Sequence, residues 1–371
     1  MALSNSDQKA TAAGAGAPGR PRVLIVRAGA IGDTLMATPL VRAVRRTFPQ
    51  CHLVFLCSAT ALDAVRFNPH LDQAIPVAFR HLPAWLSSEK TRILRALRRL
   101  DLDWAVVLES HPSFIDLARK CGARRIIAYS GDEHVEGFEP ARFDPHKHSI
   151  ENHLQAASPL RLRPDGLQME LNYQPETDGA VARRLEKAGV KSGDCLIGVH
   201  AGWGGRTRTP GQVRLRSWLP ERFAEVIRWL AEERGARVVL TGSAADRPLV
   251  RHLVRAAAVP CIDMAGELTL AELAALIRRM NAYLTVDSGP AHMAAALGTS
   301  LVTLWGPAIL EQTAPISPGN PPRILRHRVP CAPCYGTPLM KTCKDNICMK
   351  EIQVEEVRSA LDEVLGRHRA H

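Results

Sequence analysis

Three glycine-containing turns follow apolar runs and carry residue types that could bind or transfer a charged group. The first is AGAIGD (28–33), which comes after RVLIVR and ends in Asp33. Gly29 and Gly32 let a ligand approach the backbone closely, and Asp33 could act as a general base toward a substrate hydroxyl. An Asp at a helix start is also an ordinary N-cap, so the turn alone leaves both interpretations open.

The second turn, VHAGWGGRTRTPGQVRLRSW (199–218), combines flexible glycines with several arginines. Gly202 comes two residues after the end of an apolar run, and the arginines are Arg206, Arg208, Arg214 and Arg216. Guanidinium groups hold phosphate oxygens through paired hydrogen bonds, so this loop could bind a diphosphate. A solvated basic loop is the alternative that these residues leave open.

The third turn, VDSGPAHMAAALG (286–298), has the features of an anion site at a helix start. Asp287 ends an apolar run, Ser288 and Gly289 form the turn, and Pro290 is a residue favoured at the first helical position. Backbone N–H groups, the helix dipole and the Ser288 hydroxyl together attract negative charge. His292 falls in the first helical turn. A lone histidine is more often structural, but its place beside this turn favours function.

The segments between the turns predict how they are positioned. Short unbroken apolar runs indicate strands covered on both faces, as in a parallel sheet, with amphipathic helices between them. The predicted strands are 22–27, 52–57, 73–77, 104–110 and 124–129, then 195–200, 237–242, 260–264, 282–287 and 300–305. The predicted helices include 34–47, 219–234, 246–257, 269–280 and 290–297, while residues 130–175 break the pattern. The length of 371 residues suggests two such α/β domains, whose ligands bind beyond the carboxyl ends of the strands.

Composition and charge restrict the partners. The net charge of +11 favours a polyanionic partner, but the aromatic content of 5% gives little support to stacking on single-stranded nucleic acid. We therefore expect no nucleic-acid partner. No apolar run reaches the ~18–20 residues of a membrane-spanning helix, and the first residues lack the apolar core of a signal peptide. These features predict a disordered tail over 1–21 and a cytoplasmic protein.

With these motifs in view, the chain resembles glycosyltransferase family 9, the ADP-heptose:lipopolysaccharide heptosyltransferases, from about residue 22 to 365. The matching segments, in order, are RVLIVRAGAIGDTLMATPLVRAVRRTFP (22–49), LDWAVVLESHPSFIDLARKCGARRIIAY (102–129), GVHAG (198–202), SWLPERFAEVI (217–227), VVLTGSAADRPLV (238–250), AGELTLAELAALIRRMNAYLTVDSGPAHMAAALGTSLVTLWGP (265–307) and CAPCYGTPLMKTCKDNICMKEIQVEEV (331–357).

The resemblance implies a GT-B fold, in which two Rossmann-like domains with parallel sheets face a central cleft. An acceptor domain would cover 22–176 and a nucleotide-sugar domain 177–330, followed by a Cys-rich segment and a C-terminal helix over 331–371. Helix 352–365 would cross back to the first domain. The implied reaction is an inverting transfer of heptose from ADP-heptose to a hydroxyl of the lipopolysaccharide inner core, with no essential cofactor or metal.

The resemblance also implies roles for individual residues. Asp33 would be the general base and Arg216 the cation at the diphosphate, with Arg214 as the alternative because the register of this loop departs from the family. A helix start should lower the pKa of Asp33 and weaken it as a base. The implied nucleotide-sugar contacts are Gly202, Arg214, Asp246 near the ribose, Leu268 near the adenine, Asp287, Ser288, Gly289 and His292. The implied acceptor contacts are Gly29, Gly32, Arg92, Arg95 and His148.

Other interpretations stay open. The chain could use another nucleotide sugar, or it could be an inactive relative that only binds nucleotide or lipopolysaccharide. Arg92, Arg95 and Arg99 recur along one helix, which is typical either of a helix lying on the anionic cytoplasmic face of the inner membrane or of an ordinary solvated face.

Four cysteines crowd into a short segment with the spacing C-x2-C-x8-C-x4-C. They are Cys331, Cys334, Cys343 and Cys348. Tetrahedral zinc is chemically reasonable for four thiolates, but the second pair is looser than the usual C-x2-C. Disulfides are unfavourable in a reducing cytosol. We expect a local structural staple, with or without a bound metal ion, and assign no catalytic metal.

Overall fold

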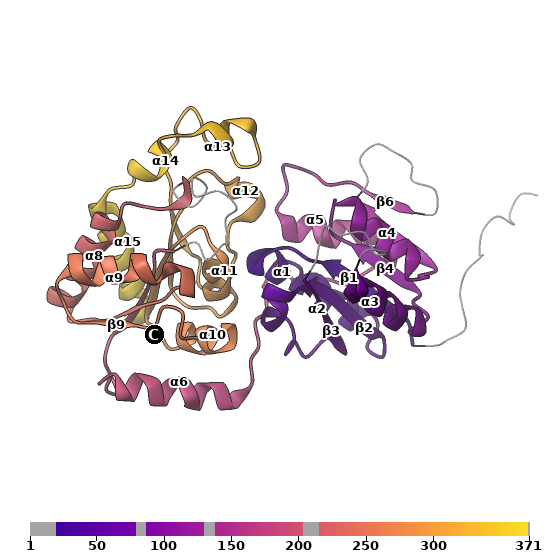
Figure 1. Cartoon of the computed structure of the whole chain (residues 1–371), viewed down its shortest axis with the longest axis horizontal. Helices are drawn as coiled ribbons and strands as arrows, with labels where there is room; N and C mark the ends of the chain where they lie inside the picture. Colours follow the sequence, from indigo (N-terminus) through magenta and orange to yellow (C-terminus); the bar gives the residue numbers. More distant parts are fainter. Residues whose placement is uncertain (1–19, 79–86, 130–137, 203–214, 370–371) are drawn as a thin grey trace, which may run out of the picture.

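The structure, a computed structural model, describes residues 20–78, 87–129, 138–202 and 215–369. These residues form two domains that lie side by side along the long axis of the molecule (Figure 1). Each domain contains one parallel six-stranded sheet covered by helices on both faces. The predicted class, α/β with two Rossmann-like domains, is confirmed. Most of the predicted tail, 1–21, lies outside the described residues.

The first sheet has the strand order β3-β2-β1-β4-β5-β6. Its strands are β1 (Arg22–Arg27), β2 (His52–Ser58), β3 (Gln73–Val77), β4 (Trp104–Val107), β5 (Arg125–Tyr129) and β6 (Glu139–Ala141). The apolar run of β1 does not alternate because both faces are covered: Leu24 and Val26 enter one core, Val23 and Ile25 the other.

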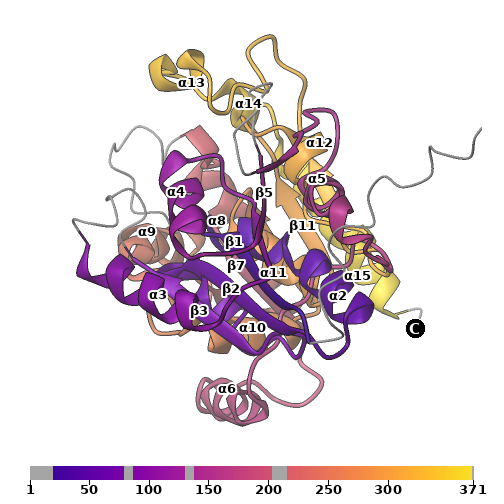
Figure 2. The ribbon, with the colours of Figure 1, turned by 90° about the vertical axis from the view of Figure 1, so that its right-hand side faces the viewer.

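Helices of the first domain cover both faces of this sheet. They are α1 (Ile31–Leu35), α2 (Thr38–Thr47), α3 (Ser88–Arg99), α4 (Pro112–Lys120) and α5 (Ser149–Ala156), with short 3-10 turns η1 (Ala59–Ala64) and η3 (Ser158–Leu160). Figure 2 shows α3 and α4 on one face of the sheet and α2 and α5 on the other.

The second sheet has the strand order β12-β11-β10-β7-β8-β9. Read from the β9 end, the second sheet has the same connection order as the first. Its strands are β7 (Leu196–His200), β8 (Arg237–Leu240), β9 (Cys261–Asp263), β10 (Ala282–Val286), β11 (Leu301–Leu304) and β12 (Arg323–Leu325). Its helices are α6 (Pro175–Lys187), α8 (Pro220–Glu232), α9 (Arg247–Ala257), α10 (Leu270–Arg278), α11 (Gly289–Ala296) and α12 (Leu310–Thr313), with η4 (Ala244–Asp246) before α9.

The two sheets meet through their carboxyl ends. The helix α1 follows β1, the helix α11 follows β10, and these two helices pack against each other between the domains (Figure 1). In each sheet the direction in which successive strands are added reverses once. This reversal lies between β1 and β4 in the first sheet and between β7 and β10 in the second. Such a reversal opens the crevice in which α/β sheets bind ligands.

The C-terminal helix differs from its prediction. After α13 (Pro338–Thr342) and α14 (Ile347–Lys350), the chain ends in α15 (Val354–Arg369). The expectation that this helix returns to the first domain is wrong, because Val357, Leu361 and Val364 enter the core of the second domain. There α15 packs against α8, β10, β11 and β12. None of the helices in the described ranges combines the length and apolar character needed to cross a bilayer.

Smaller differences concern the edges of the predicted elements. The predicted helix 34–47 is broken near Met36 into α1 and α2. The edge strands β6 and β12 were not predicted because each has only 3 residues, too few to form an apolar run. The proposed domain boundary, 176/177, falls inside the first turn of α6, which packs on α10 of the second domain.

Candidate active site

The first half of the site lies where β1 turns into α1. Asp33 accepts a hydrogen bond from the Ala30 amide at 2.9 Å. Its other carboxylate oxygen accepts one from Arg27 Nη2 at 2.8 Å. Arg27 is the last residue of β1, so strand and helix together fix this ion pair. The Asp33 side chain is still 34% exposed, which leaves it open to a substrate hydroxyl.

The neighbours of Asp33 keep it ionised. Burial alone would raise its pKa, but the charge of Arg27, the Ala30 amide, His292 and His153 together hold the pKa of Asp33 below its usual value. The expected direction of this shift is confirmed, and Arg27 contributes most to the lowering. An ionised Asp33 can accept a proton, although a lowered pKa makes it a weaker base. Its placement must then contribute much of any rate enhancement.

The second half of the site lies at the carboxyl end of β10. The buried carboxylate of Asp287 follows this strand and lies 3.1 Å from Nη1 of Arg216. Burial raises the pKa of Asp287, and the charge of Arg216 opposes that rise. Arg216 also stacks on Tyr335, with its Cζ 4.5 Å from the ring centroid. These contacts fix a guanidinium group beside the turn that starts α11.

The turn at α11 has the predicted residues at a helix start. Ser288 is the N-cap in extended backbone, and its hydroxyl lies 3.0 Å from that of Thr285. Gly289 and Pro290 begin the helix, whose first turn contains no acidic residue. The N-terminal dipole of α11 is therefore not neutralised within its own first turn, and an anion placed there would be stabilised.

Gly32 and His292 join the two halves. A β-carbon on Gly32 would lie 2.5 Å from Cδ2 of His292, so only glycine allows α1 to approach α11 this closely. Burial lowers the pKa of His292 to about 4. Its Nδ1 is buried, and no group of the described structure forms a hydrogen bond with it. His292 is thus a neutral ring that lies between the Asp33 helix and the Ser288 turn.

Two of the residues assigned to the nucleotide follow neighbouring strands of the second sheet: Gly202 comes after β7 and Asp246 after β8. A β-carbon on Gly202 would collide with the Asp246 carboxylate, so the Gly202 backbone lies directly against that side chain. One oxygen of Asp246 accepts hydrogen bonds from the N–H and hydroxyl of Ser243, at 2.8 and 2.7 Å. Leu268 is half-buried at the edge of a core formed with α10 and α11. These placements are compatible with the assigned ribose and adenine contacts, which stay predictions.

Comparisons with known proteins point to one family of glycosyltransferases. The model of glycosyltransferase family 9 (heptosyltransferase) matches residues 211–343. Lipopolysaccharide heptosyltransferase 3 of Escherichia coli is 26% identical over 287 residues, which covers 74% of this chain and 80% of that protein. The chain is therefore similar to glycosyltransferase family 9 over residues 211–343, and to curated heptosyltransferases over most of its length.

Solved structures show the GT-B fold of this glycosyltransferase. The family 9 glycosyltransferase of Veillonella parvula superposes with a TM-score of 0.79 at 20% identity, covering 94% of this chain and 98% of that one. The E. coli ADP-heptose lps heptosyltransferase II gives a TM-score of 0.74 at 21% identity, covering 94% and 99%. Both resemblances extend across the two domains, so the whole described arrangement is that of the GT-B fold.

Other predicted site residues of the glycosyltransferase lie away from the contact of α1 with α11 or form hydrogen bonds within the protein. Arg92 and Arg95 are exposed on α3. His148 caps α5 by accepting a hydrogen bond from the Ile150 amide, and its Nε2 lies 3.0 Å from the Ala314 carbonyl of the second domain. Both of its ring nitrogens are thus used, and its role in acceptor binding stays a prediction. Arg214 lies outside the described residues.

The Cys-rich segment supports the Arg216 segment. Cys334 and Met340 form a small core with Leu215, and the Asn346 side chain donates a hydrogen bond to the Ser217 carbonyl at 2.8 Å. All four cysteines are unpaired thiols. Burial and the three other thiols raise the pKa of Cys348 to about 11. Within the described ranges, no group of three or more His, Cys, Asp or Glu is arranged to hold a metal.

Sequence reasoning missed three polar residues at the carboxyl ends of central strands. Arg27 and Glu109 lie at or just beyond the carboxyl ends of β1 and β4, the two central strands of the first sheet. His200 ends β7, where its Nδ1 lies 3.1 Å from the Thr241 hydroxyl and its Nε2 is buried without a partner in the described structure. All three follow one pattern that the sequence shows: a polar residue at or just after the end of an apolar strand.

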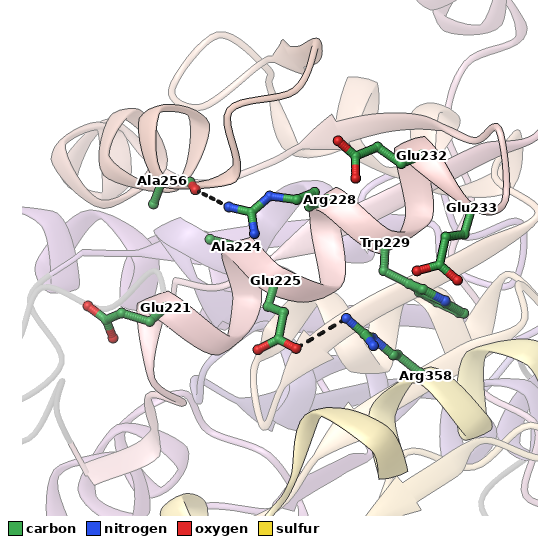
Figure 3. A pocket seen from close by; sticks show the side chains of 9 residues that line it. All are labelled: Glu221, Ala224, Glu225, Arg228, Trp229, Glu232, Glu233, Ala256 and Arg358. Carbon is green, nitrogen blue, oxygen red and sulfur yellow. Dashed lines mark hydrogen bonds and ion pairs between the residues drawn. The ribbon is translucent and has the colours of Figure 1, made fainter.

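A groove on the outer surface includes none of the predicted site residues. It encloses about 440 Å³ and lies along α8, between α9 and α15 (Figure 3). Its lining is mostly charged, with Arg228 reaching the Ala256 carbonyl and Arg358 paired with Glu225. The candidate active site is therefore defined by the junction of α1 and α11 and not by this groove.

Proposed function

We propose that this glycosyltransferase moves heptose from ADP-heptose to a hydroxyl of the lipopolysaccharide inner core, with inversion at the anomeric carbon. The names of its relatives support the donor and the acceptor class. The observation that carries the proposal is the contact between α1 and α11, which brings the Asp33 helix of one domain to the anion turn of the other.

The proposed transfer is a single in-line displacement. Asp33 takes the proton from the acceptor hydroxyl while that oxygen forms a bond to the anomeric carbon of the heptose. The bond between this carbon and the diphosphate oxygen breaks, and ADP leaves with the electron pair. Because attack and departure occur on opposite faces, the configuration inverts. General-base catalysis of this kind typically contributes 10²–10⁴-fold.

The second domain stabilises the charge that develops on ADP. Arg216, the dipole of α11 and a hydrogen bond from neutral His292 would all act on the diphosphate. Asp287 orients Arg216 through their ion pair. We propose that these groups make an essential bound metal unnecessary.

We further propose that the enzyme works in the cytoplasm, against the inner membrane surface where the acceptor is built. The exposed arginines of α3 support this partner, since basic helices are attracted to anionic lipid headgroups. No nucleic-acid partner is proposed.

The test is release of ADP from ADP-heptose in the presence of truncated inner-core lipopolysaccharide. The wild-type protein should release ADP and extend the acceptor, and Asp33→Asn should lower the rate about 10²–10⁴-fold while ADP binding by calorimetry is retained. Asp116→Asn, which removes an exposed carboxylate paired with Lys120 on α4, is the matched control. Turnover only with another nucleotide sugar would replace the donor assignment. ADP binding without turnover would favour the inactive relative.

A further inference from the structure

Arg27 lies between two carboxylates at the carboxyl edge of the first sheet. Its Nη2 donates to Asp33 at 2.8 Å, while its Nη1 donates to the Leu108 carbonyl at 2.8 Å and lies 3.5 Å from Oε1 of Glu109. Arg27 and Glu109 are largely buried, with 18% and 12% of their side chains exposed. Two groups that follow β4, the Leu108 carbonyl and the Glu109 carboxylate, thus hold one side of the guanidinium group, while its other side binds Asp33.

We propose that Arg27 and Glu109 are positioning residues of the transfer reaction: Arg27 aims the Asp33 carboxylate, and Glu109 draws part of the Arg27 guanidinium away from it. This inference rests on the proposed role of Asp33 as general base. It differs from that role because neither Arg27 nor Glu109 is required to touch substrate.

Near pH 7, the other titratable groups around Asp33 are neutral or paired, so the balance at that pH depends on Arg27 and Glu109. From α5 and α11, His153 and His292 face Asp33, and burial lowers their pKa values to about 3 and about 4. Both rings are therefore neutral near pH 7. From β5, the Tyr129 phenol faces Arg27 with a pKa that burial raises. From the second domain, Asp287 faces Asp33 and is paired with Arg216.

The two positions should therefore act on Asp33 in opposite directions. Without Glu109, Arg27 can turn fully onto Asp33, and the pKa of Asp33 falls further. The base then becomes weaker, so kcat falls. Without Arg27, the pKa of Asp33 rises because burial is no longer opposed by the guanidinium charge, and the carboxylate also loses the group that holds its direction.

Two measurements test this pair. Carbon-13 NMR titration of the Asp33 carboxyl, assigned with Asp33→Asn, should show a lower pKa in Glu109→Gln and a higher pKa in Arg27→Met. In the ADP-release assay, Glu109→Gln should lower kcat about threefold or more and Arg27→Met about tenfold or more, with the donor KM unchanged because the donor residues lie on the other domain. Arg27→Lys, which keeps the charge, should restore part of kcat.

A double-mutant cycle decides whether Glu109 acts through Arg27. In the Arg27→Met background, Glu109→Gln should cause little further loss. Glu139→Gln, which breaks an exposed ion pair with Arg125 on the same domain, is the control and should change neither kcat nor the Asp33 titration.

The proposal is overturned if the Asp33 titration does not move, or if Glu109→Gln lowers kcat equally in both backgrounds. A loss of kcat with an unchanged Asp33 titration would point to a merely structural role. The NMR titration needs neither donor nor acceptor, so it remains decisive even if the wild-type protein fails to transfer heptose.

Discussion

At the scale of single residues, the site depends on how closely α1 approaches α11. The ring of His292 occupies the space in which any side chain at position 32 would begin. Because a misplacement of about 1 Å can cost about 10²-fold in rate, the identity of this one residue should matter to catalysis more than to folding.

Gly32→Ala should therefore lower kcat by about tenfold to 10²-fold, since the added methyl group pushes His292 or α1 aside. The ADP-release assay measures the change, and circular dichroism checks that the fold is kept. Gly319→Ala is the matched control, because a β-carbon there meets no atom within 4 Å. A Gly32→Ala enzyme with wild-type kcat would show that this contact is not required for transfer.

The residues that sequence analysis found and missed differ in their local signals. Asp33, Ser288 and His292 lie in or directly after glycine-containing turns, which mark a strand–helix junction in the sequence itself. Arg27 ends β1 and Glu109 lies just beyond β4, and they meet only because β1 pairs with β4. The pairing of Arg216 with Asp287 likewise joins segments about 70 positions apart, which no local pattern reveals.

At the scale of elements, the Cys-rich segment acts as a support for the Arg216 segment. It contributes the Tyr335 ring below the guanidinium group and the Asn346 amide that binds the Ser217 carbonyl. The cysteine pattern predicted a local structural staple, but the sequence did not reveal which segment it supports.

Tyr335→Ala should raise the donor KM several-fold, because a cation–π contact contributes about 0.5–1 kcal/mol or more and its loss frees Arg216. Tyr335→Phe keeps the ring and should behave as wild type. Initial rates at varied ADP-heptose concentration give the KM values. Equal KM values for the Ala and Phe variants would remove the ring from the account of donor binding.

The helix α3 provides a second prediction at this scale. Ile93, Leu94 and Leu97 face the sheet, while Arg92, Arg95 and Arg99 are exposed. Reversing these three charges to Glu should weaken binding to phosphatidylglycerol vesicles at least tenfold, since each basic residue near an anionic surface contributes about 1 kcal/mol.

Co-sedimentation with vesicles measures that binding. The triple reversal Arg183→Glu, Lys187→Glu and Lys191→Glu, at exposed positions in and after α6, changes the net charge by the same amount and should weaken binding much less. Equal losses in both triple variants would mean that net charge, and not the face of α3, determines the attraction.

At the scale of the whole molecule, the sequence predicted two α/β domains but not the domain on which the C-terminal helix packs. The apolar runs of β1 and β7 are long enough to be recognised as strands from the sequence alone, without knowing which strands they pair with. The apolar face of α15 fits either domain in principle, and only the tertiary packing of Val357 and Leu361 against α8, β10 and β11 selects the second.

Buried histidines should make the stability of the whole protein depend on pH. Burial lowers the pKa values of His153 to about 3 and of His200 and His292 to about 4. An unfolded chain binds these protons near pH ~6.5, so it holds more protons than the folded chain at lower pH. The free energy of unfolding should therefore fall as the pH drops from about 6.5 to about 4, by up to about 1.4 kcal/mol per pH unit for each histidine.

Denaturant titrations at pH 7.5 and 5.0 measure this loss. His200→Gln should reduce the difference between the two pH values, whatever its effect at pH 7.5. His146→Gln, at an exposed position, should leave the difference unchanged. A pH difference as large in His200→Gln as in the wild type would contradict the assignment of His200 as a buried neutral ring.

The packing of α1 on α11 also bears on what happens when no acceptor is present. If the domains move apart to admit a substrate, Asp33 leaves with one domain and the diphosphate turn stays with the other. Water entering that gap meets the activated sugar without a base beside it. Because the site is complete only while α1 touches α11, separation of the domains would protect the donor from wasteful hydrolysis between turnovers.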